Sequence, residues 1–313
     1  MLDVAPLSPK LPFGSIVRGM TLARLREDTV RDALRALFYD RGLVVFREGE
    51  TTVELQIRLS EVIAPLVRHF QEDRIVGGHP ELVAFAADAE KDMTVEIDGK
   101  TVVGFIPWHG DSRWMAEPSH GGILRVHRLP KRGGETGFID LISSYGRLPQ
   151  ALKQAIEGAE SIVEFDSDPA VLFRYHPHQI RVISAGSAIE AMRGRHNDFP
   201  PIVQPLVYLQ PETGRKVLGF TPLPRQRVIG LEPADSDALL ARLAEHTTDE
   251  RYAYFHAWQA EDLVLWDNLR MLHQACGVPP GEQREVWRTT FAAAYPLARK
   301  LEEGGFAWKP QAA

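Results

Sequence analysis

From Trp108 onward the chain consists of short apolar or alternating runs that are separated by glycine- and proline-containing turns. These runs cover residues 123–127, 136–141, 206–209, 217–220, 263–266 and 286–293. Runs of this length between turn residues are typical of β-strands. Many short strands with few helices predict a mainly β fold, a double-stranded β-helix (jelly roll, cupin-like) with peripheral helices, which can enclose a site.

Four helices are expected, two before that series of strands and two within it. They cover residues 25–39, 52–67, 148–159 and 232–247. In the first of them, Val30, Leu34 and Phe38 recur at the spacing of one helix face. Thr51 or Thr52 is the candidate N-cap of the second. Between these two helices, residues 43–46 are expected to form a short buried strand.

Two stretches have no stable period. Residues 71–107 carry turn signals at Gly77-Gly78 and Asp98-Gly99 and are expected to be a mobile loop region with a small hairpin. Residues 161–204 mix proline, histidine, arginine and glycine, and so long a stretch within a compact domain is expected to be a lid or binding loop. We therefore expect a single jelly-roll domain over residues 1–313 with these two insertions.

Composition excludes several kinds of site and partner. The net charge of −6 and scattered basic residues give no electrostatic reason to expect nucleic acid or an anionic membrane as partner. Cys276 is the only cysteine, which excludes an intramolecular disulfide and a four-cysteine zinc or iron–sulfur site. No run reaches the ~18 apolar residues of a membrane-spanning helix, and the first residues do not form a secretory signal. We expect a soluble protein of the reducing cytoplasm.

Three residues form a candidate metal site, called here the metal triad: His109, Asp111 and His273. In a strand, residues i and i+2 point to the same side, so His109 and Asp111 can bind one metal ion from a single strand edge. His273 follows an apolar strand and a turn at Asp267-Asn268. Two histidines and one carboxylate with other positions open are the ligand set of non-heme Fe(II) oxygenases.

Such a site needs electrons from a cosubstrate to activate dioxygen, and 2-oxoglutarate is the usual donor. Its keto-acid end chelates iron, and its distal carboxylate needs a planar bidentate partner, which arginine supplies better than lysine. Arg284, on the strand expected after His273, is the candidate partner. The hydroxyl of Thr136 would complete the clamp on this carboxylate.

The chain resembles the taurine/2,4-dichlorophenoxyacetate dioxygenases, the TauD/TfdA family of Fe(II)/2-oxoglutarate enzymes. In that family, His-x-Asp is followed by a Thr or Ser, a distant His, and an Arg shortly beyond it. Here Thr136 stands 25 residues after Asp111, and Arg284 stands 11 residues after His273. The flanking sequences WHGDSRW, GGETGFID, PETGRK, LVLWDNLRMLHQ and REVWRTTF agree with the family. The resemblance spans residues 13–295.

The resemblance implies that the metal triad binds Fe(II) and that Thr136 and Arg284 hold the distal carboxylate of 2-oxoglutarate. It further implies an enzyme that consumes O2 and 2-oxoglutarate, releases succinate and CO2, and oxidises a small organic acid. The oxidation is expected to be a hydroxylation, with cleavage of a C–O or C–S bond in some substrates. Members of the family commonly form dimers or tetramers, so a homo-oligomer is expected.

Four residues are candidates for contact with the substrate. Arg288 matches a family arginine that reaches the cosubstrate or an anionic group of the substrate, the alternative being a solvated strand arginine. His69 falls near the place of a substrate-binding histidine in some members, the alternative being a structural histidine. Phe105 and Trp114 are expected to line an apolar pocket together with Trp108, the alternative being core packing.

Departures from the family leave the substrate open. Members that bind a sulfonate often carry Asn four residues before the first iron ligand, where this chain has Phe105. Residues 204–206, Gln-Pro-Leu, stand in a region that usually carries a His. Because Asp111 is retained, a halide cannot easily replace the carboxylate ligand, which argues against halogenation.

The sequence is also compatible with three other functions. The same cofactors serve desaturation or cyclisation of natural-product intermediates. A jelly-roll protein that only binds a ligand is a second alternative, against which the intact metal triad and Arg284 argue. Zinc-dependent hydrolysis is a third, and it gives no role to Thr136 and Arg284.

Overall fold

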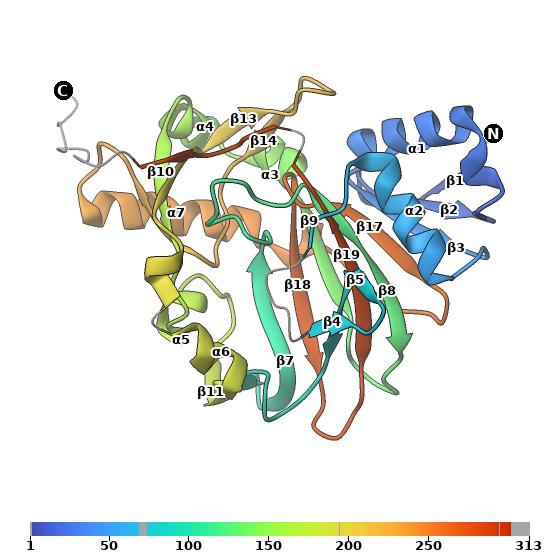
Figure 1. Cartoon of the computed structure of the whole chain (residues 1–313). Helices are drawn as coiled ribbons and strands as arrows, with labels where there is room; N and C mark the ends of the chain where they lie inside the picture. Colours follow the sequence, from blue (N-terminus) through green and yellow to red (C-terminus); the bar gives the residue numbers. More distant parts are fainter. Residues whose placement is uncertain (1, 69–73, 194, 294, 302–313) are drawn as a thin grey trace.

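Two facing β-sheets form the centre of the molecule, and helices cover its two sides (Figure 1). The computed structural model describes residues 2–68, 74–193, 195–293 and 295–301. The eight-stranded sheet contains, in spatial order, β1 (Asp3–Pro6), β2 (Ser15–Arg18), β3 (Leu43–Arg47), β17 (Leu263–Asp267), β8 (Gly121–Arg128), β19 (Glu285–Phe291), β5 (His79–Ala86) and β4 (Ile75–Val76). The six-stranded sheet contains β11 (Ile180–Ser184), β6 (Thr94–Ile97), β7 (Lys100–His109), β18 (Met271–Val278), β9 (Thr136–Asp140) and β16 (Tyr254–His256).

Two smaller sheets and the helices surround this pair. The smaller sheets are formed by β15 (Arg225–Val228), β10 (Glu160–Glu164), β12 (Ile202–Pro205) and β20 (Arg299–Lys300), and by β13 (Val207–Leu209) with β14 (Lys216–Leu218). The α-helices are α1 (Asp28–Arg41), α2 (Val53–Ile63), α3 (Leu141–Arg147), α4 (Gln150–Ile156), α5 (Pro169–Leu172), α6 (Gly186–Met192) and α7 (Pro233–Thr247). Short 3-10 helices are η1 (Arg24–Arg26), η3 (Arg195–Asp198) and η4 (Glu250–Tyr252).

The predicted jelly roll is confirmed by how the chain passes between the two large sheets. Strands β7, β9 and β18 belong to the six-stranded sheet, whereas β8, β17 and β19 belong to the eight-stranded one. The chain therefore crosses from one sheet to the other after β7, β8, β17 and β18. Apolar side chains of both sheets share one cluster, with Val45 and Val264 from one side and Phe138 and Met271 from the other. Their removal from water stabilises the sandwich.

The expectation of a mobile loop over residues 71–107 is wrong for the residues that the structure describes. Strand β5 pairs with β19 in the eight-stranded sheet, and β6 and β7 belong to the six-stranded sheet. The small hairpin was expected correctly: Asp98 and Gly99, both with positive φ, join β6 to β7. The strands themselves show no clean alternation because β7 has side chains buried on both faces near its end.

Residues 161–204 also contain more regular structure than expected. Strands β10 and β12 pair with each other, and β11 extends the six-stranded sheet beside β6. The intervening helices α5 and α6 have only 4 and 7 residues. Such short elements leave no periodic signal in a sequence window of ordinary length, which is why this stretch looked irregular.

Prolines explain three helix boundaries that differ from the prediction. Helix α2 ends at Ile63 because Pro65 forces the preceding residue, Ala64, into an extended conformation. The helix expected over 148–159 corresponds to α4 alone, which begins at Gln150 because Leu148 is extended ahead of Pro149, and α3 was not expected. Helix α7 begins at Pro233, whose missing N–H is tolerated in the first turn.

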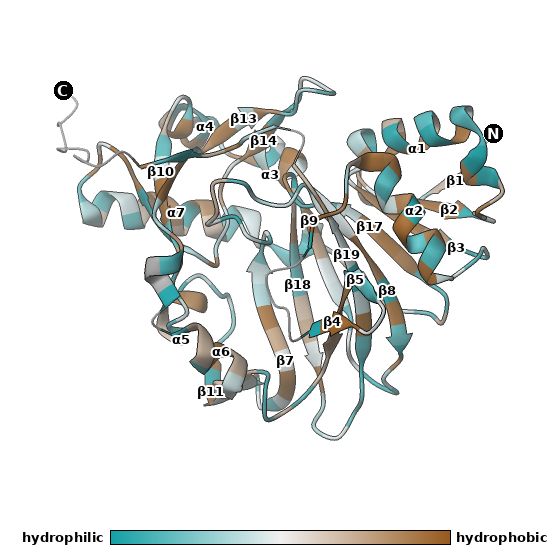
Figure 2. Ribbon diagram, viewed as in Figure 1, coloured by the Kyte–Doolittle hydropathy of each residue, from teal (hydrophilic) through white to brown (hydrophobic). Residues whose placement is uncertain are grey.

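The N-terminal helices cover one side of the eight-stranded sheet. Val30, Leu34 and Phe38 of α1 are buried in the cluster that also holds Phe291 of β19. The outward side of α1 is hydrophilic (Figure 2). Thr52 caps α2, because its hydroxyl accepts the backbone N–H of Leu55 at 3.1 Å. Within the described part of the chain, no helix combines the length and the apolar character needed to cross a membrane.

Candidate active site

The structure brings the three residues of the metal triad together at one end of the six-stranded sheet. His109 is the last residue of β7 and pairs directly with His273 of β18. The Nε2 atoms of His109 and His273 lie 3.5 and 3.7 Å from Oδ1 of Asp111. One ligand atom from each residue lies within 4.8 Å of the others, a spacing that suits a single metal ion.

The two imidazoles are held in a form that can bind a metal. Nδ1 of His109 lies 2.7 Å from the backbone carbonyl of Pro107, which can only accept, so Nδ1 carries the proton. The lone pair of its Nε2 therefore faces the site. Burial, assisted by the neighbouring His109, lowers the pKa of His273 to about 3. A neutral imidazole is the state that ligates metal ions.

Asp111 is ionised and its two oxygens have different partners. Burial opposes its ionisation, but the Arg288 guanidinium outweighs this and holds the pKa of the carboxyl well below its usual range. Nη1 of Arg288 donates to Oδ2 at 2.6 Å. Oδ1, the other oxygen, faces both histidines and is the one available to a metal ion.

The backbone beside Asp111 is fixed by Asn268, in the turn between β17 and β18. The Asp111 N–H donates to Oδ1 of Asn268 at 2.7 Å. The amide nitrogen of Asn268 donates to the carbonyls of Asp111 and Ser119, both at 2.9 Å. This side chain therefore ties the metal-binding turn to the β17–β18 turn. Sequence reasoning placed Asn268 in a turn and missed this role.

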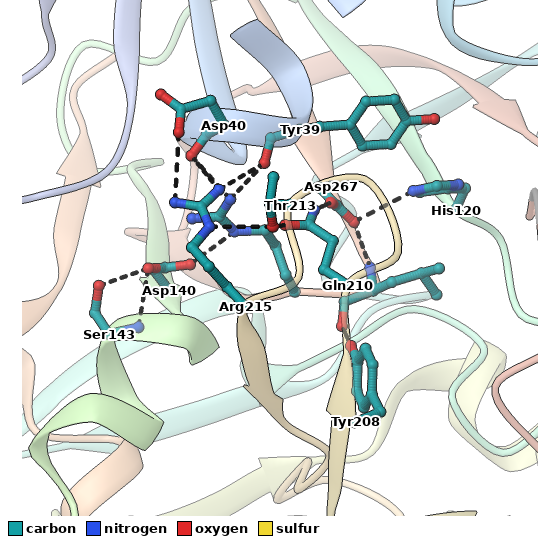
Figure 3. A network of polar contacts seen from close by, with 12 residues as sticks. Tyr39, Asp40, His120, Asp140, Ser143, Tyr208, Gln210, Thr213, Arg215 and Asp267 are labelled. Atoms are coloured by element: carbon teal, nitrogen blue, oxygen red, sulfur yellow. Dashed lines mark hydrogen bonds and ion pairs between the residues drawn. The ribbon is translucent and has the colours of Figure 1, made fainter. Parts of the chain in front are cut away.

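A buried network holds the β17–β18 turn in place (Figure 3). Asp267 accepts hydrogen bonds from Nε2 of Gln210 at 3.2 Å and from the Leu269 N–H at 3.0 Å. Burial raises the pKa of the Asp267 carboxyl. Nε of Arg270 donates to Asp140 at 2.9 Å, and its Nη1 donates to the carbonyl of Tyr39. The turn that carries Asn268 is thus fixed to α1, to β9 and to the turn that follows β13.

Thr136 and Arg284 meet in the wall of the cavity that the metal triad also lines. Thr136 is the first residue of β9, and Nη2 of Arg284 donates to its hydroxyl at 3.1 Å. Burial lowers the pKa of Arg284 to about 10. Among the described residues, no carboxylate lies within ion-pair distance of this guanidinium. A buried cation without an anion is unfavourable, so the site fits an anionic ligand such as the distal carboxylate of 2-oxoglutarate.

One cavity of about 320 Å³ connects these groups. The metal triad, Thr136, Arg284 and Arg288 all line it. Much of its remaining wall is apolar and comes from Met93, Phe105, Trp114, Phe165, Leu172, Phe173, Ile189 and Met192. Iron, 2-oxoglutarate and a small substrate could therefore share one space that is largely lined by side chains without hydrogen-bonding groups.

The structure separates the aromatic residues that were expected to line the pocket. Phe105 and Trp114 do lie in the cavity wall, and the ring centroids of Trp114 and Phe165 are 5.3 Å apart. Trp108 is buried in the hydrophobic core instead, over Gly137, where a Cβ would come within 2.5 Å of its ring. His69 lies outside the described residues.

Several wall residues were not found from the sequence. Phe165, Phe173, Ile189 and Met192 all come from the stretch 161–204. One signal did point to them, because an irregular stretch of this length is expected to be a lid or binding loop. Closure of this segment over a ligand stays a prediction.

Comparison with known proteins identifies the family. The family model described as "Taurine catabolism dioxygenase TauD, TfdA family" matches residues 3–290. The (S)-phenoxypropionate/alpha-ketoglutarate-dioxygenase of Sphingobium herbicidovorans is 31% identical, over 93% of this chain and 94% of the relative. The alpha-ketoglutarate-dependent 2,4-dichlorophenoxyacetate dioxygenase of Cupriavidus pinatubonensis is 29% identical, over 91% of this chain and 96% of the relative.

A solved structure agrees with the fold. The taurine dioxygenase from Burkholderia xenovorans superimposes with a TM-score of 0.71 at 23% identity, over 96% of each chain. At this identity the likeness bears on the fold alone. The family match, the 2-oxoglutarate-dependent relatives and the metal triad together show that the chain belongs to the TauD/TfdA family and is a dioxygenase that uses Fe(II), 2-oxoglutarate and O2.

Proposed function

We propose that the protein oxidises a small organic acid with an aryl or similarly apolar body, and that aryloxyalkanoates are the class that fits best. The observation that carries this proposal is the cavity, which combines largely apolar walls with the Arg288 guanidinium beside the metal triad. The two relatives named above act, by their names, on phenoxypropionate and 2,4-dichlorophenoxyacetate. These substrates have the shape and charge that such a cavity accepts.

Arg288 is the proposed partner of the substrate's carboxylate. Its Nη1 is bound to Asp111, while its Nε is buried and has no hydrogen-bond partner among the described residues. A buried donor without an acceptor is costly, so an incoming carboxylate would be favoured here. The guanidinium also lies over the ring of Phe85, 4.9 Å from its centroid, which limits its movement.

Phe105 favours an aromatic body over a sulfonate. Its side chain is buried in the wall and packs against Phe173 and His176, with centroid distances of 6.2 and 5.5 Å. A phenyl ring offers no hydrogen bond to a sulfonate oxygen, whereas it offers contact area to another ring.

When bound, iron and 2-oxoglutarate supply the oxidising chemistry: O2 and 2-oxoglutarate are consumed, succinate and CO2 are released, and one oxygen atom enters a C–H bond of the substrate. In an aryloxyalkanoate, hydroxylation of the carbon that bears the ether oxygen gives a product that divides into a phenol and a 2-oxo acid. The chain's own residues hold the metal, the distal carboxylate of 2-oxoglutarate and the carboxylate of the substrate. They also keep the apolar body of the substrate oriented toward the metal triad.

Succinate and phenol formation with phenoxyacetate and both enantiomers of 2-phenoxypropionate tests this proposal, with taurine as the matched sulfonate. We expect at least one of the aryloxy acids to release phenol. Taurine should not increase the formation of succinate. His109→Ala should abolish iron binding and phenol release together. Succinate formation stimulated by taurine, with no phenol from any aryloxy acid, would overturn the substrate class while leaving the family chemistry intact.

A further inference from the structure

The hydroxyl of Thr136 has two donors pointing at it. Nε1 of Trp258 donates to Oγ1 at 3.1 Å, and Nη2 of Arg284 donates to the same oxygen at 3.1 Å. An indole N–H and a guanidinium N–H can only donate. A hydroxyl has two lone pairs and one proton. Both lone pairs of Thr136 are therefore in use, and its proton is what remains for a ligand.

We propose that Trp258 is a positioning residue for 2-oxoglutarate: by occupying one lone pair of Thr136, it makes this hydroxyl a donor toward the distal carboxylate. Arg284 alone would leave one lone pair free, and the hydroxyl could then turn that lone pair toward the carboxylate, where it would repel the anion. With the indole in place, Thr136 and Arg284 both present protons to the same carboxylate.

The indole is held in position by the end of β16. The ring of His256 lies at 90° to it with centroids 4.6 Å apart. His256 is fully buried, and its Nε2 lies 3.0 Å from Oδ2 of Asp262. The backbone N–H of Gln259, the next residue after Trp258, donates to the same carboxylate oxygen at 3.0 Å.

The neighbouring strand places this assembly beside the clamp. His256 of β16 is the register partner of Thr136 of β9. The Arg284 guanidinium also lies over the Trp258 ring, 5.9 Å from its centroid. The side chain of Trp258 therefore contacts both members of the clamp, and its hydrogen-bond and ring contacts among the described residues do not include the metal triad.

Binding to the Mn(II)-loaded enzyme tests the proposal without turnover. Trp258→Phe keeps an aromatic ring and removes the N–H donor. We expect calorimetry to show a dissociation constant for 2-oxoglutarate about 5- to 20-fold higher than in the wild type, because a hydrogen bond to a charged group is weakened. Oxalate, which chelates the metal and has no distal carboxylate, should bind Trp258→Phe and the wild type equally.

Trp287→Phe is the matched control, because Nε1 of Trp287 donates to Glu285 at 2.6 Å and Trp287 is absent from the cavity lining. It should leave the affinity for both ligands unchanged. In a Thr136→Val background, Trp258→Phe should have no further effect on 2-oxoglutarate, since the hydroxyl that it orients is gone.

Unchanged affinity of Trp258→Phe for 2-oxoglutarate would overturn the proposal, and so would an equal loss of oxalate binding. If Trp258→Phe fails to fold, a benzothienylalanine at position 258 removes the N–H and keeps the bicyclic shape, with the same two expected results. The inference rests on the family's use of 2-oxoglutarate and not on the proposed substrate. If the wild-type enzyme bound no 2-oxoglutarate, the use of 2-oxoglutarate as cosubstrate would itself be contradicted.

Discussion

At the scale of single residues, Gly134 provides the space for the Arg284 side chain. A Cβ at this position would lie 2.8 Å from Cδ of Arg284 and 2.8 Å from Cγ of Pro130. Gly134→Ala should therefore displace the guanidinium from Thr136. We expect the KM for 2-oxoglutarate to rise about tenfold or more, in line with a lost charge-assisted contact, while the affinity for Mn(II) alone stays the same.

Gly158→Ala is the control for this prediction. Both glycines have positive φ, +83° at Gly134 and +71° at Gly158, so alanine strains the backbone at either position. A Cβ at Gly158 meets nothing within 4 Å among the described residues. Gly158→Ala should thus lower thermal stability and leave the KM for 2-oxoglutarate unchanged. Equal effects of the two variants on this KM would show that backbone strain, and not the clash with Arg284, is responsible.

Asn268 gives a second prediction at this scale. Asn268→Ala removes the four side-chain hydrogen bonds that join the β17–β18 turn to Asp111 and Ser119. Because partners that orient metal ligands typically contribute 10- to 100-fold to affinity, we expect Fe(II) or Mn(II) binding to weaken by about that factor.

Metal titration monitored by calorimetry checks the Asn268 prediction, with Gln283→Ala as the control. Gln283 also accepts a side-chain hydrogen bond, from Arg128 at 2.6 Å, but at an exposed position and with no contact to the metal triad. Metal affinity of Asn268→Ala equal to that of the wild type would mean that the turn keeps its position without this side chain.

At the scale of elements, an ion pair joins β3 to the start of β17. Nε and Nη2 of Arg47 donate to both oxygens of Asp262, at 2.8 and 3.1 Å. Burial opposes ionisation of Asp262, but the bonds from His256 and Arg47 outweigh it and lower the pKa of this carboxyl below 3.8. A lowered pKa in the folded state stabilises the fold above the unfolded-state pKa, and this stabilisation disappears as the pH falls through the folded-state pKa.

We therefore expect Arg47→Met to lose stability at pH 7 and to show a smaller decrease in stability than the wild type as the pH falls below about 4. Urea unfolding at a series of pH values measures both effects. Arg58→Met is the control, since its partner Glu61 is exposed and such pairs contribute little. If the stability of Arg47→Met and that of the wild type decreased in parallel with falling pH, the ionisation of Asp262 would not be the source of this pH dependence.

The elements also show which parts of the fold and site the sequence could predict. Local signals sufficed for many strands of the jelly roll and for the pair His109 and Asp111, because turn residues and the His-x-Asp spacing are local, whereas the distant His273 also needed the family pattern. The bond from Trp258 to Thr136 joins residues 122 positions apart, and the bond from Asn268 to Asp111 spans 157 positions. Contacts of this kind depend on strand register, which no local pattern specifies.

At the scale of the whole molecule, the enzyme buries the Arg284 cation, and we propose that the cosubstrate supplies its anionic partner. Desolvation lowers the pKa of Arg284 to about 10, and the described residues provide no carboxylate to pair with it. Replacing a buried charge by an apolar side chain of similar size is often neutral or stabilising. Arg284→Met should therefore unfold, without ligands, at the same temperature as the wild type or at a higher one.

The same substitution should abolish stabilisation by 2-oxoglutarate. A ligand present at 100 times its dissociation constant stabilises the folded state by about 2.7 kcal/mol, so Mn(II) with 2-oxoglutarate should raise the unfolding temperature of the wild type by several degrees. For Arg284→Met we expect the increase that Mn(II) alone produces and no more. An unfolding temperature of ligand-free Arg284→Met below that of the ligand-free wild type would contradict this prediction. It would mean that the guanidinium stabilises the fold itself, because contacts within the protein, and not the cosubstrate, would then offset the cost of its burial.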